Sequence, residues 1–240
     1  MKEVSSRTSH VLSVAYLSFA LSGLFFLAWL TFHSPMLIVK IPFHKQVIGS
    51  IFAAICLLGI LLGVSPSRLS RQTHIRSQKK NDEAGQANSR VIFMGHHPVC
   101  GNFSSHVLKL WGKTCCAGCT GLITGAMISL LGTFTYFFLD FHVGEAVTLV
   151  FWLGFGCVVC GLLQYHVVIK RSSFHFLVNV VFVLGAFLLL VGVSEVTGSL
   201  ILEAYLFTLI IYWIITRIIL SQREHEKICA TCNLKSCAYL

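Results

Sequence analysis

Two pairs of potential metal ligands lie close together in the middle of the sequence. The first pair is His97 and Cys100, in HPVC, and the second is Cys116 and Cys119, in CAGC. Fifteen residues separate Cys100 from Cys116. Because a tight turn directs both ligands of such a pair toward one point, this spacing is typical of a tetrahedral zinc site. The sequence therefore predicts a metal site formed by His97, Cys100, Cys116 and Cys119.

The segment that connects the two pairs favours a zinc-ribbon-like arrangement. Residues 107–111 and 113–115 flank Gly112, so a short hairpin is expected to carry the chain from the first pair to the second. Zinc is the preferred metal, iron or an iron–sulfur cluster is the alternative, and a set of unligated thiols is the simplest interpretation. Substitute ligands are present at His96, His106 and Cys115.

A second group of potential ligands lies near the C-terminal end of the sequence. Three thiols and an imidazole fall within thirteen residues, at His225, Cys229, Cys232 and Cys237. This set is suited to a separate tetrahedral site. The alternatives are that it supplies ligands to the first site, that it is a redox-active dithiol, or that its cysteines are unligated.

Long apolar segments must position these ligands. Hydrophobic residues make up 55% of the chain and charged residues only 11%, whereas about a quarter of the residues of a soluble domain are charged. Six segments approach or exceed the roughly 20 apolar residues that cross a bilayer as a helix, at 11–32, 47–64, 117–139, 146–169, 174–194 and 200–220. The first segment is longer than a signal-peptide core and is interpreted as an uncleaved anchor.

The predicted fold class is an all-α integral membrane protein with about six transmembrane helices and a small cytoplasmic zinc-ribbon-like insertion before the third. Residues 65–90 carry many charges and almost no large apolar side chains, so this stretch is expected to be a disordered linker. Its basic residues are suited to anionic lipid headgroups, or the linker is a plain spacer. The predicted division is a two-helix membrane segment at 1–64, the basic linker at 65–90, a metal-binding module at 91–120, a four-helix membrane segment at 117–220 and a Cys-rich tail at 221–240.

The distribution of basic residues predicts the orientation of the helices. Sixteen of the eighteen Lys and Arg residues fall on the side that holds both termini, the linker and the cysteine pairs. Such residues accumulate in cytoplasmic loops, so we expect a multi-pass protein of the cell membrane with both termini in the cytoplasm. Thiols are kept reduced there, which disfavours disulfides. The accumulation of basic residues in cytoplasmic loops also accounts for the net charge of +9. The positive charge therefore needs no nucleic-acid partner to explain it, and none is expected.

Several polar residues within or next to the apolar segments form a possible intramembrane site. Cys157, Cys160 and Gln164 follow a helical spacing of i, i+3 and i+7, and His175 and Asn179 are four residues apart on the next segment. Polar groups within a membrane usually face the interior of the bundle, often at functional sites. The alternative is that the cysteines are small packing residues and that Asn179 bonds between helices. The candidate set is Cys157, Cys160, Gln164, His166, His175 and Asn179.

Small residues recur every four positions along the third apolar segment, at Gly121, Gly125, Ser129 and Thr133. A helix with such a face allows another helix to approach closely. We therefore expect this face to pack against a neighbouring helix, with no further role.

The second cysteine pair and the helix that follows it resemble a family of predicted prokaryotic membrane proteins of unknown function, whose hallmark is Cys-Ala-Arg-Cys-Thr-Gly-Ile-Tyr-x-Gly at the start of a transmembrane helix. The matching residues are Cys116, Ala117, Cys119, Thr120, Gly121 and Gly125, with an upstream cysteine at Cys100. The HHPVC form, with Phe103 and His106, looks like an archaeal branch. A later Asp-Gly-x-x-Gln element of the family is similar to residues 160–164, where Cys160 replaces the acid. The resemblance covers about residues 96–180 and implies a membrane protein without an assigned reaction.

Three functions compete on the sequence alone, and no residue set identifies a reaction. The leading hypothesis is a cytoplasmic zinc module that organises one face of the membrane protein or docks a cytoplasmic protein partner, since a site with four protein ligands is closed. The second is a membrane oxidoreductase or metal-dependent enzyme that uses the tail cysteines with Cys160, Gln164, His166 and His175. A transporter ranks last, because the segments show no central pair of carboxylates and no inverted repeat.

Overall fold

The structure is a computed structural model that describes residues 2–33, 43–64, 93–94, 97–98, 106–110, 113–139, 141–164 and 171–230. Side chains are described at residues 11–33, 43–64, 106–108, 115–139, 141–164, 171–225 and 227–228. The predicted linker at 65–90 lies outside the described residues. So do Cys100, His166, Cys232 and Cys237 among the candidate ligands and site residues.

Within the described residues, six helices are long and apolar enough to cross a membrane. They are α1 (Lys2–His33), α2 (His44–Val64), α4 (Ala117–Thr133, continued by the π-helical turn η3, Phe134–Phe138), α5 (Val147–Leu163, preceded by the 3₁₀ turn η4, Gly144–Ala146), α6 (Ser172–Thr197) and α7 (Leu200–Ala230). Each predicted apolar segment overlaps one of them, although the fourth, at 146–169, extends past Leu163, the last residue of α5, into residues outside the described part of the chain. The prediction of an all-α multi-pass membrane protein is therefore confirmed.

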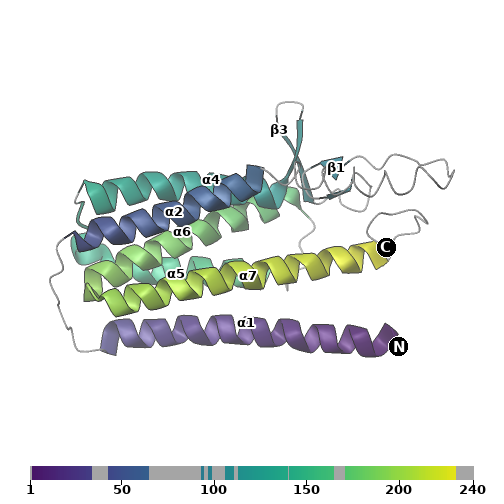
Figure 1. The fold of residues 1–240 in the computed structure, drawn as a ribbon, viewed down its shortest axis with the longest axis horizontal. Helices are drawn as coiled ribbons and strands as arrows, with labels where there is room; N and C mark the ends of the chain where they lie inside the picture. Colours follow the sequence, from purple (N-terminus) through teal and green to yellow (C-terminus); the bar gives the residue numbers. More distant parts are fainter. Residues whose placement is uncertain are drawn as a thin grey trace.

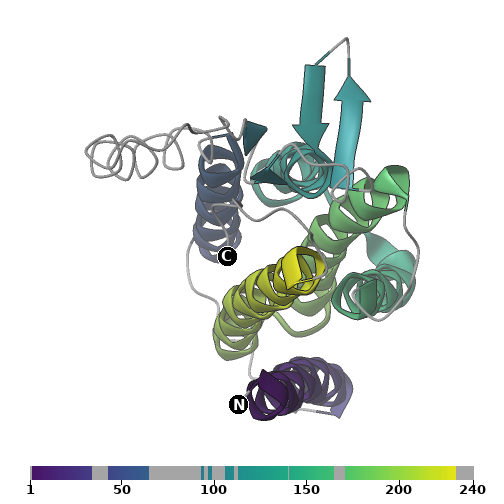
Figure 2. The same ribbon diagram turned by 90° about the vertical axis from the view of Figure 1, so that its right-hand side faces the viewer.

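Helix α6 forms the centre of the bundle. It packs against α4 on one side and α5 on the other, while α2 covers α4 and α1 pairs with α7 (Figures 1 and 2). The central place of α6 follows from its sequence, because it is apolar on all sides and lacks charged residues over most of its length.

Glycines allow α6 to approach both neighbours. A Cβ atom at Gly121 of α4 would lie 2.4 Å from the carbonyl oxygen of Phe176, and one at Gly154 of α5 would lie 2.9 Å from that of Gly185. Ser129 and Thr133, further along the same face of α4, are also buried. The close packing predicted for the small-residue face of α4 is confirmed.

Replacing Gly121 with Ala is expected to destabilise the bundle, because the added methyl group would overlap backbone atoms of α6. Overpacking of this kind costs about 1–3 kcal/mol. The matched control is Gly59→Ala in α2, where an added Cβ meets nothing within 4 Å and Ala is the better helix former. Thermal unfolding in detergent should show a lower midpoint for Gly121→Ala alone; equal midpoints would contradict the close crossing of α4 and α6.

Helix α1 is fastened to α7 by polar aromatic side chains that bond to its backbone. The Tyr205 hydroxyl donates to the carbonyl oxygen of Gly23 at 3.2 Å, and the Trp213 indole donates to that of Ala20 at 3.3 Å. A third bond joins the Tyr212 hydroxyl to the carbonyl oxygen of Tyr16. The pairing is antiparallel, so the beginning of α1 and the end of α7 lie at the same end of the bundle (Figure 1).

Helix α7 continues ten residues beyond the predicted apolar segment, to Ala230. The added residues are mostly strong helix formers, and Glu224 and Lys227 are one turn apart with opposite charges. The first half of the predicted Cys-rich tail therefore extends the last helix, a feature that hydropathy alone does not detect.

Two short hairpins lie at the end of the bundle where α7 ends (Figure 1). Strands β3 (Val107–Leu110) and β4 (Lys113–Cys116) are antiparallel, with Leu110 opposite Lys113, so the predicted hairpin is confirmed. Strands β1 (Phe93–Met94) and β2 (His97–Pro98) form the other hairpin. Within the described residues the two hairpins are separate two-stranded sheets, although β1 contacts β4.

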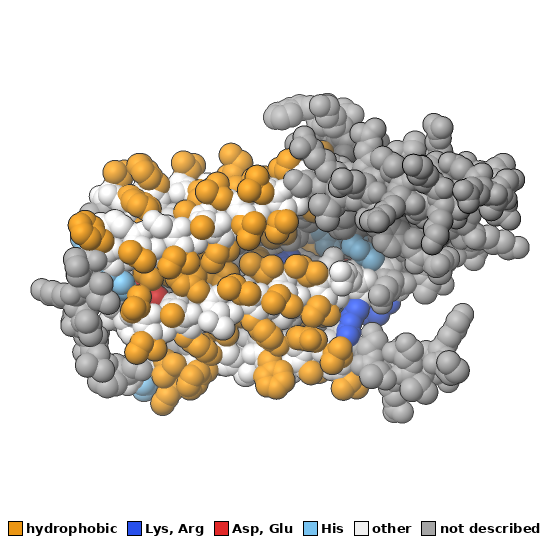
Figure 3. All heavy atoms as spheres, in the orientation of Figure 1, with side chains coloured by type: hydrophobic (Ala, Val, Ile, Leu, Met, Phe, Trp, Pro, Cys, Tyr) orange, Lys and Arg blue, Asp and Glu red, His pale blue; other side chains and the backbone are white. Residues whose placement is uncertain are grey.

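Apolar side chains cover the outer surface of the helices (Figure 3). Large residues such as Leu131, Leu149 and Ile201 are at least 70% exposed. A soluble protein rarely exposes contiguous apolar surface on this scale, whereas lipid acyl chains cover such a surface in a membrane. The lipid bilayer is therefore the environment of the helical bundle.

Candidate functional site: a cysteine and histidine cluster at the hairpin end

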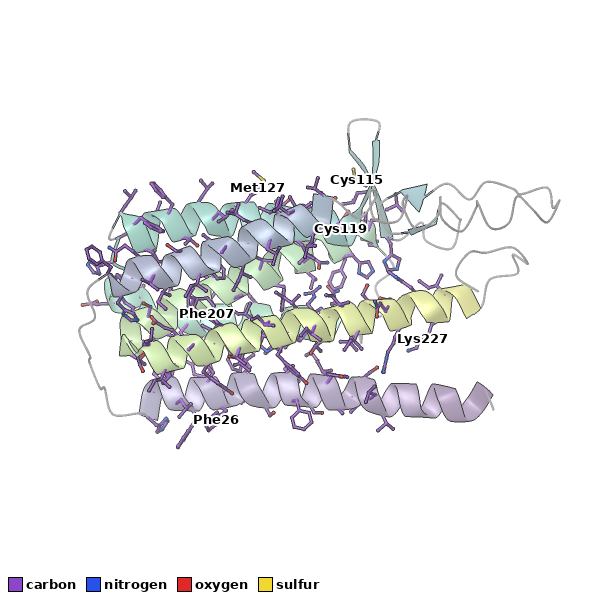
Figure 4. All side chains as sticks on the ribbon, in the orientation of Figure 1. Phe26, Cys115, Cys119, Met127, Phe207 and Lys227 are labelled. Atoms are coloured by element: carbon purple, nitrogen blue, oxygen red, sulfur yellow. The ribbon has the colours of Figure 1, made fainter. Side chains whose placement is uncertain are left out.

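Cys116 and Cys119 lie at the junction between strand β4 and helix α4. Cys116 is the last residue of the strand and the N-cap of the helix, with extended backbone angles of φ −66° and ψ 122°. The Thr120 hydroxyl donates to the carbonyl oxygen of Cys116 at 2.8 Å, which fixes the first turn. The thiols of Cys116 and Cys119 form a hydrogen bond with each other. Figure 4 shows Cys115 and Cys119 at the base of the β3–β4 hairpin.

Three histidines from three different elements meet beside this pair. His106 directly precedes β3, His175 is in the first turn of α6, and His225 is near the end of α7. The rings of His106 and His175 stack with centroids 4.7 Å apart, and the His225 ring lies edge-on to His106 at 6.0 Å. His175 is buried and lies close enough to Cys116 for an electrostatic interaction. The histidines therefore connect the cysteine-bearing hairpin to the helical bundle.

A buried polar pair lies one helical turn deeper. The Asn179 side chain donates through Nδ2 to the carbonyl oxygen of His175 and accepts from Nη2 of Arg217 at 2.7 Å. The Arg217 guanidinium also lies 4.3 Å from the centre of the Phe182 ring, which is cation–π geometry. Asn179 and Arg217 are 5% and 6% exposed. One buried charged side chain, that of Arg217, therefore lies one helical turn from the cysteine and histidine cluster.

The predicted intramembrane site divides between the inside and the outside of the bundle. Asn179 and His175 face inward, and Gln164, the residue after the end of α5, is also buried. Cys157 is partly buried, with its Cβ against Gly185 of α6. Cys160 is exposed on α5. The structure thus brings His175 and Asn179 to the cluster but leaves Cys160 on the outer surface.

Two of the four residues of the predicted metal site have described side chains, and these two are in contact with each other. The backbone of His97 lies in β2, whose partner β1 contacts β4, so the hairpin of the first pair lies beside the strand that carries the second pair. The His97 and Cys100 side chains lie outside the described part of the chain. Among described side chains, no group of three or more His, Cys, Asp and Glu residues is arranged around a common metal position. The ligand set His97, Cys100, Cys116 and Cys119 stays a prediction.

The second predicted ligand set begins at the cluster. His225 contacts His106, and the backbone of Cys229 follows one turn later on the same helix. Residues four apart share a helix face. The start of the set therefore lies against the hairpin rather than apart from it, while Cys232 and Cys237 lie outside the described residues.

Sequence reasoning missed two features of this site. The count of basic residues treats Arg217 only as a topological charge, whereas the structure buries it as a hydrogen-bond partner of Asn179. The sequence suggests His106 as a substitute metal ligand. In the structure its ring also stacks on that of His175 and so joins the hairpin to α6. The sequence does contain an indication of the role of Arg217, because this residue lies within an apolar segment. Ionisable residues within such segments normally face the protein interior.

Comparison with known proteins found no matching family model, no matching curated protein and no matching solved structure. The resemblance to the family with the Cys-Ala-x-Cys-Thr-Gly motif therefore stays a prediction.

Proposed function

We propose that the chain is a multi-pass membrane protein in which a zinc ion, held by His97, Cys100, Cys116 and Cys119, fixes the hairpins to the helical bundle. The observation that carries the proposal is the contact between the thiols of Cys116 and Cys119 at the strand–helix junction. Both thiols come from one rigid turn, and the hairpin that contains His97 lies beside it. The role of the site is structural, or it presents the hairpins to a partner.

The chemistry of the four residues fits zinc. Zinc binds thiolate sulfur at about 2.3 Å and imidazole nitrogen at about 2.0 Å, in tetrahedral geometry. A strand that turns into a helix brings two cysteines three residues apart to one side, which supplies half of that tetrahedron. Four protein ligands leave no position for water or substrate, so such a site stabilises structure rather than activating a reactant.

The stack of His106 on His175 extends the influence of the site into the bundle. The hairpin is tied to α6 through these rings and to α4 through the peptide that follows Cys116. A metal at this junction would therefore set the position of the hairpin relative to these two helices. The hairpin projects beyond the helices (Figure 2), where a protein partner has access to it.

The cytoplasmic placement of this end is part of the proposal. Sixteen of the eighteen Lys and Arg residues belong to the segments predicted on this side. The beginning of α1, the hairpins and the end of α7 share one end of the bundle. The cytoplasm keeps thiols reduced and therefore available to a metal. A cytoplasmic orientation of this end is thus consistent with zinc binding by its cysteines.

Metal analysis of the purified protein tests the proposal. We expect about one zinc ion per chain in the wild type, because four ligands form one tetrahedral site. The zinc content should fall in each of the single variants His97→Ala, Cys100→Ser, Cys116→Ser and Cys119→Ser. Cys160→Ser, at an exposed position on α5, is the matched control and should retain zinc. A folded wild-type protein that lacks metal would overturn the proposal.

Dithiol chemistry is the second candidate function, favoured by the same contact between Cys116 and Cys119. In an exchange with a disulfide-bonded protein partner, the two thiols would form an intramolecular disulfide and the partner disulfide would become two thiols. Thiol counting on metal-free protein distinguishes the two functions. Reversible loss of two thiols, abolished by Cys119→Ser, would favour the exchange, whereas zinc-protected thiols would favour the metal site.

A further inference from the structure

A fully buried carboxylate lies at the end of the bundle opposite the cysteines. Glu203, in the first turn of α7, is 0% exposed. Its Oε2 atom lies 2.6 Å from Nε2 of His44, the first residue of α2. Its Oε1 atom makes no hydrogen bond within the described part of the chain. A carboxyl group in this position is costly unless a proton or a positive charge compensates it.

A second acid connects this region to the surface. Oε2 of Glu195, near the end of α6, accepts a hydrogen bond from the Tyr136 hydroxyl at 2.9 Å. Its Oε1 atom lies 3.3 Å from Nδ1 of His142, whose side chain is 64% exposed. The Ser194 hydroxyl lies close to both Tyr136 and Glu203. Polar groups therefore lie at intervals between the exposed His142 and the buried Glu203.

Two backbone irregularities build this arrangement. The π-helical turn η3 follows α4 and places Tyr136, which is 3% exposed, inside the bundle. Such turns are rare in proteins as a whole, but those that do occur are often found at functional sites. Gly198 adopts a left-handed conformation with φ 53° and joins α6 to α7. This tight connection brings Ser194 next to Glu203.

The charged and titratable groups that face this region come from every neighbouring element. Helix α2 contributes His44 and Lys45, whose Nζ lies 5.1 Å from the centre of the Tyr136 ring and which interacts with Glu195. The other groups are Tyr136 of η3, His142 of the loop before α5, Glu195 of α6 and Glu203 of α7. Lys45 and His142 compensate Glu195, whereas Glu203 has His44 as its close basic partner.

We propose that Glu203 and His44 form a proton-binding site within the bundle, which exchanges protons with the solvent through Ser194, Tyr136, Glu195 and His142. A proton that enters at His142 passes to the Glu195 carboxylate. The hydroxyls of Tyr136 and Ser194 each accept one proton and release another, so neither changes its net protonation. The Glu203 carboxylate takes up the last proton and becomes a neutral carboxylic acid. This site is independent of the zinc proposal, because none of its residues lies at the hairpin end.

Infrared difference spectroscopy of the protein in lipid nanodiscs tests this inference. Spectra recorded at acidic and alkaline pH should differ by the C=O stretch of a protonated carboxylic acid in an apolar setting. We expect this band to be lost in Glu203→Gln and kept in Glu145→Gln, an exposed acid at the same end of the bundle. Tyr136→Phe should keep the band but slow its hydrogen–deuterium exchange, because the relay is broken.

A second variant keeps the test decisive if Glu203→Gln fails to fold. His44→Gln removes the partner of Glu203 and should change the pH at which the band forms. A wild-type protein without a pH-dependent carboxylic acid band would overturn the inference. So would a band that stays unchanged in both Glu203→Gln and His44→Gln, since it would belong to another group.

Discussion

Replacing Asn179 with Leu is expected to lower the free energy of unfolding of the helical bundle by about 1.5–3 kcal/mol. The substitution removes the oxygen that lies 2.7 Å from Nη2 of Arg217, while the guanidinium stays buried beside Phe182. Breaking one partner of a buried charged contact is costly because the remaining charge has already lost its water. Reversible unfolding in mixed detergent, followed by circular dichroism, measures the effect.

The double variant Asn179→Leu, Arg217→Met separates this explanation from simple loss of packing. It removes the buried charge together with its partner, and a buried polar pair replaced by apolar residues of similar size is often tolerated. We expect the double variant to be more stable than Asn179→Leu alone. Leu177→Ala, at an exposed position on the same helix, is the control and should have little effect. A double variant with the summed loss of the two single variants would contradict the account.

On the proposed zinc site, Cys116→Ser is expected to remove the metal and release the β3–β4 hairpin. Structural zinc sites contribute about 10–16 kcal/mol to the folding of small zinc-dependent modules. A hairpin of two four-residue strands has little apolar core of its own and is only marginally stable without such support. Hydrogen–deuterium exchange should accelerate in the peptide that spans residues 106–116. The central part of α6 should be unchanged, because its packing against α4 and α5 does not involve the metal.

A chelator added to the wild-type protein should reproduce this pattern, and Cys160→Ser should not. The stack of His106 on His175 holds strand β3 at the base of the hairpin, where Val107 lies opposite Cys116. We therefore expect the backbone amides of β4 to lose more protection from hydrogen–deuterium exchange than those of β3, which follows His106. Unchanged exchange throughout residues 106–116 after loss of Cys116 would show that the hairpin does not depend on a metal.

The membrane architecture could be predicted from the sequence because bilayer thickness imposes a minimum length on each apolar segment. All six segments overlap helices that are long and apolar enough to cross a membrane. The β3–β4 hairpin was also predictable, because extended-type residues flank Gly112. Local length and pattern are sufficient for features of this kind.

The division of α5 into inner and outer residues could not be predicted from spacing. Cys157, Cys160 and Gln164 occupy one stripe of an ideal helix, but contacts with α6 fix which edge of that stripe is buried. The buried face of α5 contains Gly154 and Val158. Cys157 lies at the edge of this face and is partly buried, whereas Cys160 lies further around the helix and is exposed. Helix rotation depends on the neighbour, which the sequence of one helix does not contain.

The buried polar contacts between helices could not be predicted from the sequence either. The pairing of Arg217 with Asn179 joins residues on different helices, and Glu203 meets His44 from the far end of the chain. Glu203 stands near the start of an apolar segment, where hydropathy alone does not distinguish a loop residue from an enclosed one. Only tertiary packing shows that it is enclosed. Ionisable residues close to the ends of predicted membrane segments are thus candidates for buried sites as well as for loops.

X-ray absorption spectroscopy at the zinc edge, on the purified wild-type protein, tests the central claim most directly. The ligand set His97, Cys100, Cys116 and Cys119 gives a first shell of three sulfur atoms at about 2.3 Å and one nitrogen atom at about 2.0 Å. In Cys119→Ser that bound metal should be lost or one sulfur should leave the shell. A protein without zinc, or a shell that contains only nitrogen and oxygen, would contradict the account.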